Sequence, residues 1–391
     1  MDFGLSDEQA AFRDAARAFA DRELAPEAAR WDAEQIFPKE AMRRAGELGF
    51  MSLYTPVADG GLGLTRLDSS IVIEELARGC TSTTAFMTIH NMALWMIATF
   101  GHERLKAEWC PKLATGEKLA SYCLTEPGAG SDAASLKTVA RACGDGYRLS
   151  GAKAFISGAG ETDVLVVMAR VADANGVREG ASGISSFVVP ADARGVSYGR
   201  KEQKMGWNSQ PTRQIAFDDV HVPAGARLGA EGEGFKIAMR GLDGGRINIA
   251  TCSIGTAQAA LERTAAYLDE RKQFGQPIGQ FQALQFKLAD MATDLVAARQ
   301  MVRLAAWKLD RGERDATTYC AMAKRFATDA GFDVCNDALQ LHGGYGYVKE
   351  LPLERHVRDL RVHQILEGTN EIMRVIIARR MMMAGAAEVI R

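Results

Sequence analysis

The stretch Leu119-Ala120-Ser121-Tyr122-Cys123-Leu124 marks the point where this sequence of 391 residues changes its repeating pattern. It follows Gly116 and is the first of several short, mainly apolar runs separated by Gly, Pro, Asp and Asn. Runs of this kind predict strands joined by surface hairpins. The others are Tyr147-Ser150, Val164-Met168, Ile184-Val189 and Ile215-Phe217. The middle of the chain is therefore expected to be an antiparallel β domain.

The residues before this stretch have helical periodicity instead. Ser6-Asp7-Glu8-Gln9 matches a capping box, and apolar residues follow it at helical spacing. Pro38 opens a second expected helix that ends near Leu48-Gly49. Three more are expected: one built on Leu67, Ile71 and Leu76, and two spanning Thr83–Phe100 and His102–Leu113.

Long helical patterns return after Glu231. The expected helices are Gly234–Cys252, Thr256–Phe274, Phe281–Arg311, Asp315–Leu341 and Thr369–Met383, which suggests an antiparallel bundle. The sequence thus predicts an α+β multidomain protein. It has an all-helical N-terminal domain (1–117), a middle antiparallel β domain (118–228) and a four-helix-bundle-like C-terminal domain (229–391). The sequence shows no alternation of strands and helices, so a parallel doubly wound sheet with a Rossmann dinucleotide site is not expected.

The composition is that of an ordinary globular protein. A net charge of -2 and a pI near 6.4 give no electrostatic footprint for nucleic acid or an anionic membrane, so neither partner is expected. The seven cysteines form no C-x-x-C pair, which favours reduced thiols. The six histidines show no paired ligand spacing, and no metal site is expected. The N-terminus resembles neither a secretory signal nor a transit peptide, so a cytoplasmic location is the default expectation.

Glu367 is the candidate catalytic residue. It follows the apolar pair Ile365-Leu366 and precedes Gly368, which permits a tight bend. A carboxylate there can be shielded from water and so become a stronger base. The alternative is that Glu-Gly is a solvated turn. Thr369 and Asn370 are favourable N-cap residues for the last expected helix.

Other glycine-rich segments have both a functional and a structural interpretation. The loop from Thr125 to Asp132 and the strand end Phe155-Ile156-Ser157 offer hydroxyls and backbone amides to a planar or anionic ligand, or they are polar turns.

Three segments in the helical half are open in the same way. Asp243-Gly244-Gly245-Arg246 interrupts a helical pattern, either for a ligand or as a kink. Arg271-Lys272-Gln273-Phe274-Gly275 suits a pyrophosphate or is a solvated charge cluster. The run from Gln340 to Tyr347 is a ligand loop or a glycine C-cap.

Taken together and in this order, these segments resemble the acyl-CoA dehydrogenase family over the whole chain. The resemblance is carried by Tyr122-x-x-Thr125-Glu126-x-Gly128-x-Gly130-Ser131-Asp132, Arg271-x-x-Phe274-Gly275, Gln340-x-x-Gly343-Gly344 and Glu367-Gly368-Thr369. It implies an enzyme with bound FAD, an acyl-CoA substrate, electron-transfer flavoprotein as the electron acceptor and a homotetrameric assembly.

The resemblance also implies a role for individual residues. Glu367 would be the catalytic base. Some members place the base in the earlier Gly-Gly-Arg region, but residue 244 here is Gly. The implied FAD contacts are Tyr122, Leu124, Thr125, Gly130, Ser131, Phe155, Ile156, Ser157, Arg271, Phe274, Phe281, Gln282, Gln340, Gly343, Gly344, Thr369, Asn370 and Glu371. The implied substrate contacts are Ser131, Asp243, Gly244, Gly245, Arg246, Gly368 and Arg379.

The expected reaction is α,β-dehydrogenation of an acyl thioester. Glu367 would remove the α-proton while the β-hydride passes to flavin N5. The segments Gly206–Arg213 and Asp359–Gly368 resemble those of members that use short branched-chain substrates, so isobutyryl-CoA is the favoured substrate. The alternatives are a short- or medium-straight-chain dehydrogenase, an oxygen-using oxidase, and a non-catalytic flavoprotein or binding scaffold.

Overall fold

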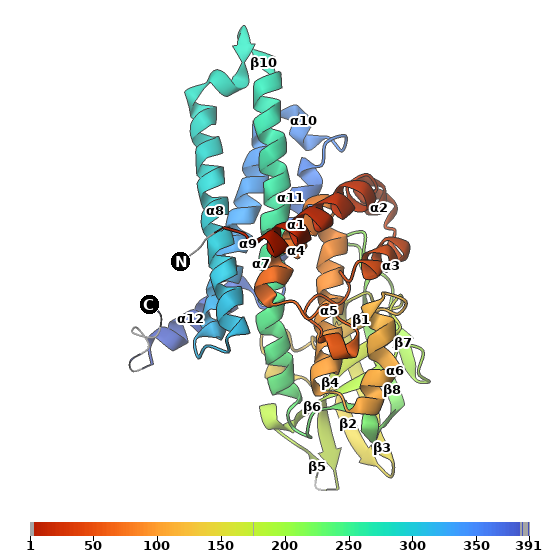
Figure 1. Ribbon diagram of the computed structural model, residues 1–391. Helices are drawn as coiled ribbons and strands as arrows, with labels where there is room; N and C mark the ends of the chain where they lie inside the picture. Colours follow the sequence, from red (N-terminus) through yellow and green to blue (C-terminus); the bar gives the residue numbers. More distant parts are fainter. Residues whose placement is uncertain (1–3, 175, 384, 386–389, 391) are drawn as a thin grey trace.

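The computed structural model describes residues 4–174, 176–383, 385 and 390. A bundle of long helices rises from a β-sheet domain, and shorter N-terminal helices pack along the side of the bundle (Figure 1). The order helices, strands, helices is therefore as the sequence predicted.

The N-terminal region is helical throughout. Its helices are α1 (Asp7–Phe19), α2 (Ala28–Glu34), α3 (Lys39–Glu47), α4 (Arg66–Gly79), α5 (Thr81–Phe100) and α6 (Glu103–Ala114). The capping box at Ser6 is confirmed, because Ser6 Oγ accepts from the Gln9 amide and the Gln9 side chain accepts from the Ser6 amide. Two expectations were incomplete: the sequence did not predict α2 or the π-helical turn Ala20–Leu24.

Helix α5 lies at the centre of the molecule. It is buried along nearly its whole length and contacts α4, α6, α7 and β1. The helix expected over Thr83–Phe100 is confirmed, and it begins two residues earlier. Among the residues that the structure describes, no helix combines the length and apolarity that a bilayer span requires.

The middle region forms one large sheet. Its strands are β1 (Ala120–Cys123), β2 (Val139–Cys143), β3 (Gly146–Ser157), β4 (Val164–Asp173), β5 (Gly176–Val177), β6 (Ile184–Pro190), β7 (Val196–Tyr198), β8 (Thr212–Pro223) and β9 (Arg227–Leu228). The main order is β7-β8-β3-β2-β4-β6-β9. Most neighbours are antiparallel, as expected, but β1 and β2 each pair with β4 in parallel. The sequence runs gave no information on strand direction.

Strand β4 is buried on both faces. Val164, Val166 and Met168 share a core with α5, α6 and α7, whereas the alternate residues Leu165 and Val167 share a core with β3 and β8. Alternation of side chains along a strand explains this division. It also explains why β4 has a continuous apolar sequence rather than an alternating one.

The C-terminal region consists of long helices with short elements at their ends. Its elements are α7 (Gly234–Glu270), β10 (Lys272–Gln273), β11 (Gln276–Pro277), α8 (Gln282–Asp310), α9 (Ala316–Leu341), α10 (Gly344–Tyr347), α11 (Leu353–Arg361) and α12 (Asn370–Met381). Short 3-10 turns cover Val57–Asp59, Ala133–Ser135, Ala181–Gly183, Ala224–Ala226, Ile278–Gln280 and Val362–Gln364.

Helix α7 corrects one prediction. The sequence suggested two helices, Gly234–Cys252 and Thr256–Phe274, and a further interruption at Asp243–Arg246 inside the first. The structure instead has one continuous helix of 37 residues. The glycines serve close packing. A Cβ at Gly255 would lie 2.1 Å from the carbonyl oxygen of Glu74 on α4, and one at Gly244 would lie 2.3 Å from Arg66 Nη1.

The close approach of α4 to α7 gives a stability prediction. Gly255→Ala should lower the free energy of unfolding by about 1–3 kcal/mol, because the new methyl group would force a backbone carbonyl to move. Thermal unfolding of the FAD-loaded protein would measure this as a lower Tm. Gly144→Ala is the matched control, since a Cβ there meets nothing within 4 Å. Equal Tm values for the two variants would contradict the packing explanation.

Candidate active site

The Glu367 loop connects the 3-10 turn Val362–Gln364 to α12. Glu367 and Gly368 both have left-handed backbones, with φ of 56° and 88°. This conformation is strained for a glutamate and is seldom kept without a functional reason. Thr369 is confirmed as the N-cap of α12, since its Oγ1 accepts from the Ile372 amide at 3.2 Å. The loop therefore ends at a helix N-terminus, as predicted.

His363 anchors the loop on its N-terminal side. Its Nε2 accepts from Trp207 Nε1 at 3.2 Å, so Nδ1 carries the proton and donates to Ser253 Oγ at 2.7 Å. The ring is completely buried, and desolvation lowers its pKa to about 3. His363 is thus a neutral structural residue, packed and hydrogen-bonded on both ring nitrogens.

Lys324 of α9 anchors the loop on its C-terminal side. Its Nζ donates to the carbonyl oxygen of Gly368 and to Asn370 Oδ1, both at 2.8 Å. The Asn370 amide nitrogen in turn donates to Asp329 Oδ1 at 2.7 Å and to Thr328 Oγ1 at 2.9 Å. Asn370, predicted as a cofactor contact, therefore lies in a buried polar network behind the catalytic candidate.

The Glu367 carboxylate points at helix α7. A Cβ at Gly245 would lie 2.5 Å from Glu367 Oε2, so the glycine makes room for the carboxylate. Oε2 is buried and has no hydrogen-bond partner among the described residues. Burial raises the pKa of Glu367 from 4.5 to about 7, although Arg246 and Lys324 oppose the rise. The solvated-turn interpretation is therefore wrong.

Other polar groups around this carboxylate also lack partners. Tyr122 Oη and Arg246 Nε are buried without a hydrogen-bond partner in the described part of the chain. Burial raises the pKa of Tyr122, and the nearby negative charge of Glu367 raises it further. Arg246 pairs with Asp243 at 2.6 Å. Unsatisfied buried groups are costly, so their gathering here fits a site that a polar ligand completes.

The loop after β1 is fixed by a buried ion pair. Lys153 Nζ lies 2.7 Å from Glu126 Oε1, and Glu126 also accepts from the amides of Lys137 and Thr138. This pair holds the loop beside the strand end at Ser157. The side-chain hydroxyls of Thr125 and Ser157 make no hydrogen bond to another described residue, so their predicted role as donors to a flavin ring stays a prediction.

A separate groove of about 510 Å³ lies at the far end of α7. It brings together the predicted residues Arg271, Gln340, Gly343 and Gly344. Within it, His342 stacks on Tyr267 with ring centroids 4.2 Å apart. His342 Nδ1 donates to the Ala338 carbonyl, which leaves Nε2 as a buried acceptor without a donor. A cation with an unsatisfied imidazole acceptor suits a diphosphate next to a nucleoside.

Several predicted residues are not gathered at either place within one chain. Phe274 is 92% exposed beside Phe281, and Phe155 is 70% exposed with a φ of 56°. Arg379 lies on the exposed side of α12, about 13 Å along the helix from its start. Gly130, Ser131, Gln282 and Glu371 are exposed as well, while Leu124 and Ile156 are buried in the β domain.

The sequence interpretation missed Lys324, although its pattern contained a signal. Lys324 occurs at helical spacing with the buried residues Cys320, Ala327 and Thr328, so it lies on the core face of α9. A lysine at such a position needs acceptors and is rarely silent.

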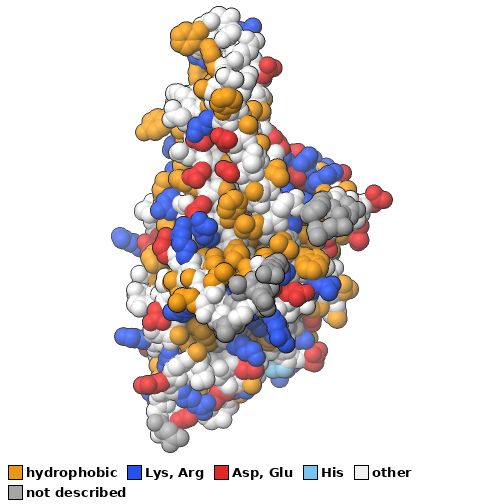
Figure 2. Space-filling view, turned by 90° about the vertical axis from the view of Figure 1, so that its left-hand side faces the viewer, with side chains coloured by type: hydrophobic (Ala, Val, Ile, Leu, Met, Phe, Trp, Pro, Cys, Tyr) orange, Lys and Arg blue, Asp and Glu red, His pale blue; other side chains and the backbone are white. Residues whose placement is uncertain are grey.

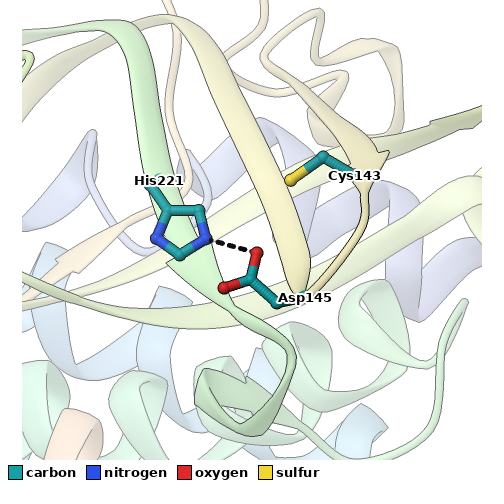
Figure 3. Close-up of side chains that lie close together, drawn as sticks. All are labelled: Cys143, Asp145 and His221. Carbon is teal, nitrogen blue, oxygen red and sulfur yellow. Dashed lines mark hydrogen bonds and ion pairs between the residues drawn. The ribbon is translucent and has the colours of Figure 1, made fainter.

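A third cluster formed by Cys143, Asp145 and His221 was also missed. Their ligand-type atoms all lie within 4.8 Å of one another, on the β2–β3 turn and on β8 (Figure 3). His221 Nε2 is 2.9 Å from Asp145 Oδ1, and this hydrogen bond lowers the pKa of the aspartate. Asp145 and His221 are exposed. The cluster is a hydrogen-bonded histidine–aspartate pair beside a thiol, and no part of the reaction is assigned to it.

Comparison with protein-family models identifies the fold family. The model for the acyl-CoA dehydrogenase N-terminal domain matches residues 6–117, the middle-domain model matches 121–220, and the C-terminal-domain model matches 232–382. This chain belongs to the acyl-CoA dehydrogenase family. It is therefore an FAD-dependent oxidoreductase of the acyl-CoA dehydrogenase type.

Similar proteins agree with this assignment. The mitochondrial isobutyryl-CoA dehydrogenase of Bos taurus is 54% identical over 97% of this chain and 90% of the relative. Among solved structures, a chain of the electron-transferring flavoprotein structure from Acidaminococcus fermentans has a TM-score of 0.94 and 39% identity, over 98% of this chain and all of that one. PigA with FAD and proline has a TM-score of 0.93 and 32% identity, over 97% and 99%.

The environment of Glu367 predicts a carboxyl group that titrates near neutrality in this acyl-CoA dehydrogenase. Infrared difference spectra of the FAD-loaded protein between pH 5 and pH 9 should show a carboxylic-acid band lost with a midpoint near 7, because burial disfavours the charged form. Asp359 is also buried, and desolvation raises its pKa to about 7, so its band should remain in Glu367→Gln. The variant should lose only the amplitude that belongs to Glu367. An unchanged amplitude would show that the raised pKa belongs to another residue.

Proposed function

We propose that this enzyme converts a short branched-chain acyl-CoA to its α,β-unsaturated product, with isobutyryl-CoA to methacrylyl-CoA as the favoured reaction. Glu367 would abstract the α-proton, and bound FAD would supply the acceptor for the β-hydride. The observation that carries the proposal is the unpartnered Glu367 Oε2, which is buried against Gly245 and has a raised pKa. The identity with isobutyryl-CoA dehydrogenase supports the choice of substrate.

Glu367 supplies the base. An α C–H is far less acidic than an ordinary carboxylic acid, so the carboxylate needs a high proton affinity and the developing enolate needs stabilisation. Burial provides the first. The Glu367 backbone amide provides a donor for the second, because it donates to no described acceptor and a thioester oxygen can take that place. Bound FAD would accept the two electrons that leave with the β-hydride.

The other residues divide into those that hold substrate and those that hold cofactor. Arg246 and Asp243 would face the acyl-CoA, whereas Tyr122, Thr125 and Ser157 would border the flavin ring. The groove lined by Arg271, Gln340 and the two glycines that follow His342 would hold the adenosine diphosphate end, through its guanidinium and its free imidazole acceptor.

The distance between these parts supports shared sites. Gly245 and Arg271 are 26 positions apart in sequence, which along α7 corresponds to about 39 Å, farther than one FAD extends. The groove of one chain would therefore serve the Glu367 of another. The exposed side of α8 carries Phe286, Val296, Leu304 and Trp307, and hydrophobic patches lie among polar and charged groups on that face of the molecule (Figure 2). Such a patch suits burial between subunits, as in the proposed homotetramer.

Electron-transfer flavoprotein is the proposed acceptor of the electrons. The support is the family resemblance together with the high similarity to a chain from the Acidaminococcus fermentans structure, which was solved in a study of that flavoprotein.

The role of Glu367 predicts a specific defect. Glu367→Gln should retain FAD and bind acyl-CoA, but it should not bleach the flavin when isobutyryl-CoA is added without oxygen, because the amide cannot accept the α-proton. Anaerobic absorbance spectra measure the bleaching, and a flavin band shift on titration with acyl-CoA reports binding. Normal bleaching by this variant would exclude Glu367 as the base. A colourless wild-type protein that releases no flavin on denaturation would exclude the enzyme altogether.

The substrate assignment predicts a ranking. Isobutyryl-CoA should give a higher kcat/KM than butyryl-, isovaleryl- or octanoyl-CoA, measured with electron-transfer flavoprotein as the acceptor. One methylene group in an apolar pocket is worth about 1–3 kcal/mol, so differences of roughly ten- to two-hundredfold are expected. A higher value for a straight-chain substrate would reassign the enzyme to that substrate.

A further inference from the structure

Lys324 is a buried cation in the wall of the Glu367 site. Its residue exposure is 0%, and its Nζ has two short contacts, with the Gly368 carbonyl and with Asn370 Oδ1. Burying an ammonium group without a carboxylate in contact is expensive. Such an arrangement is maintained only where the surrounding structure fixes it, and here the fixed structure is the backbone that follows Glu367.

From this geometry we propose that Lys324 is a positioning residue for Glu367. It clamps the left-handed Glu367-Gly368 backbone through the Gly368 carbonyl, and its positive charge keeps the nearby carboxylate ionised. The inference rests on the proposed role of Glu367 as the base. It adds a second function to α9, which would then set the base's strength as well as support the loop.

The clamp is specific because each partner of Lys324 is itself fixed. Asn370 Oδ1 is oriented by the two bonds that its amide nitrogen donates to Thr328 and Asp329. Gly368 cannot be replaced without strain, since its φ is 88° and a Cβ there would lie 2.6 Å from the Met373 side chain. Lys324 therefore holds the loop at the carbonyl of the residue that directly follows Glu367.

The electrostatic effect depends on all the charges that face this pair. Around Lys324 these are Glu367, Asp329, Arg246 and Glu371, and around Glu367 they are Arg246 and Lys324. Desolvation lowers the pKa of Lys324 to about 7, while Glu367 acts to raise it. Lys324 in turn lowers the pKa of Glu367, so removal of its charge should move that pKa upward.

The test compares three variants at position 324 in the FAD-loaded enzyme. Lys324→Met should move the acid limb of the kcat/KM profile to higher pH by about one unit. At a pH below the acid limbs of both wild type and variant, the variant's kcat/KM should then be roughly tenfold lower. Lys324→Gln should show the same shift, but its plateau kcat should be higher than that of Lys324→Met, because the glutamine amide can still donate to the Gly368 carbonyl. Lys324→Arg should leave the limb at the wild-type pH or below it. The control Lys106→Met removes a lysine paired with Glu103 on α6 and should change neither.

The infrared titration of Glu367 gives a readout that needs no turnover. Its midpoint should rise in Lys324→Met and Lys324→Gln. If the wild type dehydrogenates none of the acyl-CoA substrates offered, the proposed function is wrong. The infrared midpoint still decides the role of Lys324 in that case. Identical midpoints in wild type, Lys324→Met and Lys324→Gln would overturn the charge effect.

A milder variant covers the case in which the position-324 variants do not fold. Asn370→Ala removes one acceptor of Lys324 but retains its charge, so kcat should fall several-fold at equal FAD content without movement of the acid limb. An unchanged kcat in Asn370→Ala would overturn the clamp.

Discussion

The desolvation of one carboxylate is the constraint on which the site depends. Glu367 can be buried against α7 only because Gly245 has no side chain, and it can point there only because Glu367 and Gly368 adopt left-handed backbones. Both conditions cost stability, since glycine weakens a helix and a left-handed glutamate is strained. The surrounding residues counter these costs. On the N-terminal side of the loop, the neutral ring of His363 is hydrogen-bonded to Ser253. On the C-terminal side, Lys324 of α9 donates to the Gly368 carbonyl.

Helix α7 also sets the distance between the Glu367 site and the groove with Arg271. Helix α7 passes beside the β domain, forms the surface against which Glu367 is buried, and ends at the groove with Arg271 (Figure 1). A single helix of this length keeps the two binding regions at a fixed separation, because its backbone hydrogen bonds are continuous. In the proposed assembly, the nucleotide groove of one chain would serve the Glu367 site of another.

Much of the fold could be predicted from local patterns, because caps and periodicities are local properties. The capping box at Ser6, the N-cap at Thr369 and the change of pattern near Leu119 all correspond to observed boundaries. The prediction was wrong at α7, where glycines looked like breaks. Their purpose lies in distant groups, Arg66 and the Glu74 carbonyl, which no local pattern reveals. For Lys324, the local spacing marks a position on the core face of α9, but the role of the lysine depends on acceptors 44 and 46 residues away.

The packing of Glu367 over α7 has an evolutionary consequence. A side chain at position 245 and a glutamate at position 367 would occupy the same space, because a Cβ on α7 would come within 2.5 Å of the carboxylate oxygen. The two positions should therefore covary among homologues: a chain with a side chain at position 245 needs a shorter residue than glutamate at position 367, or a different path for it.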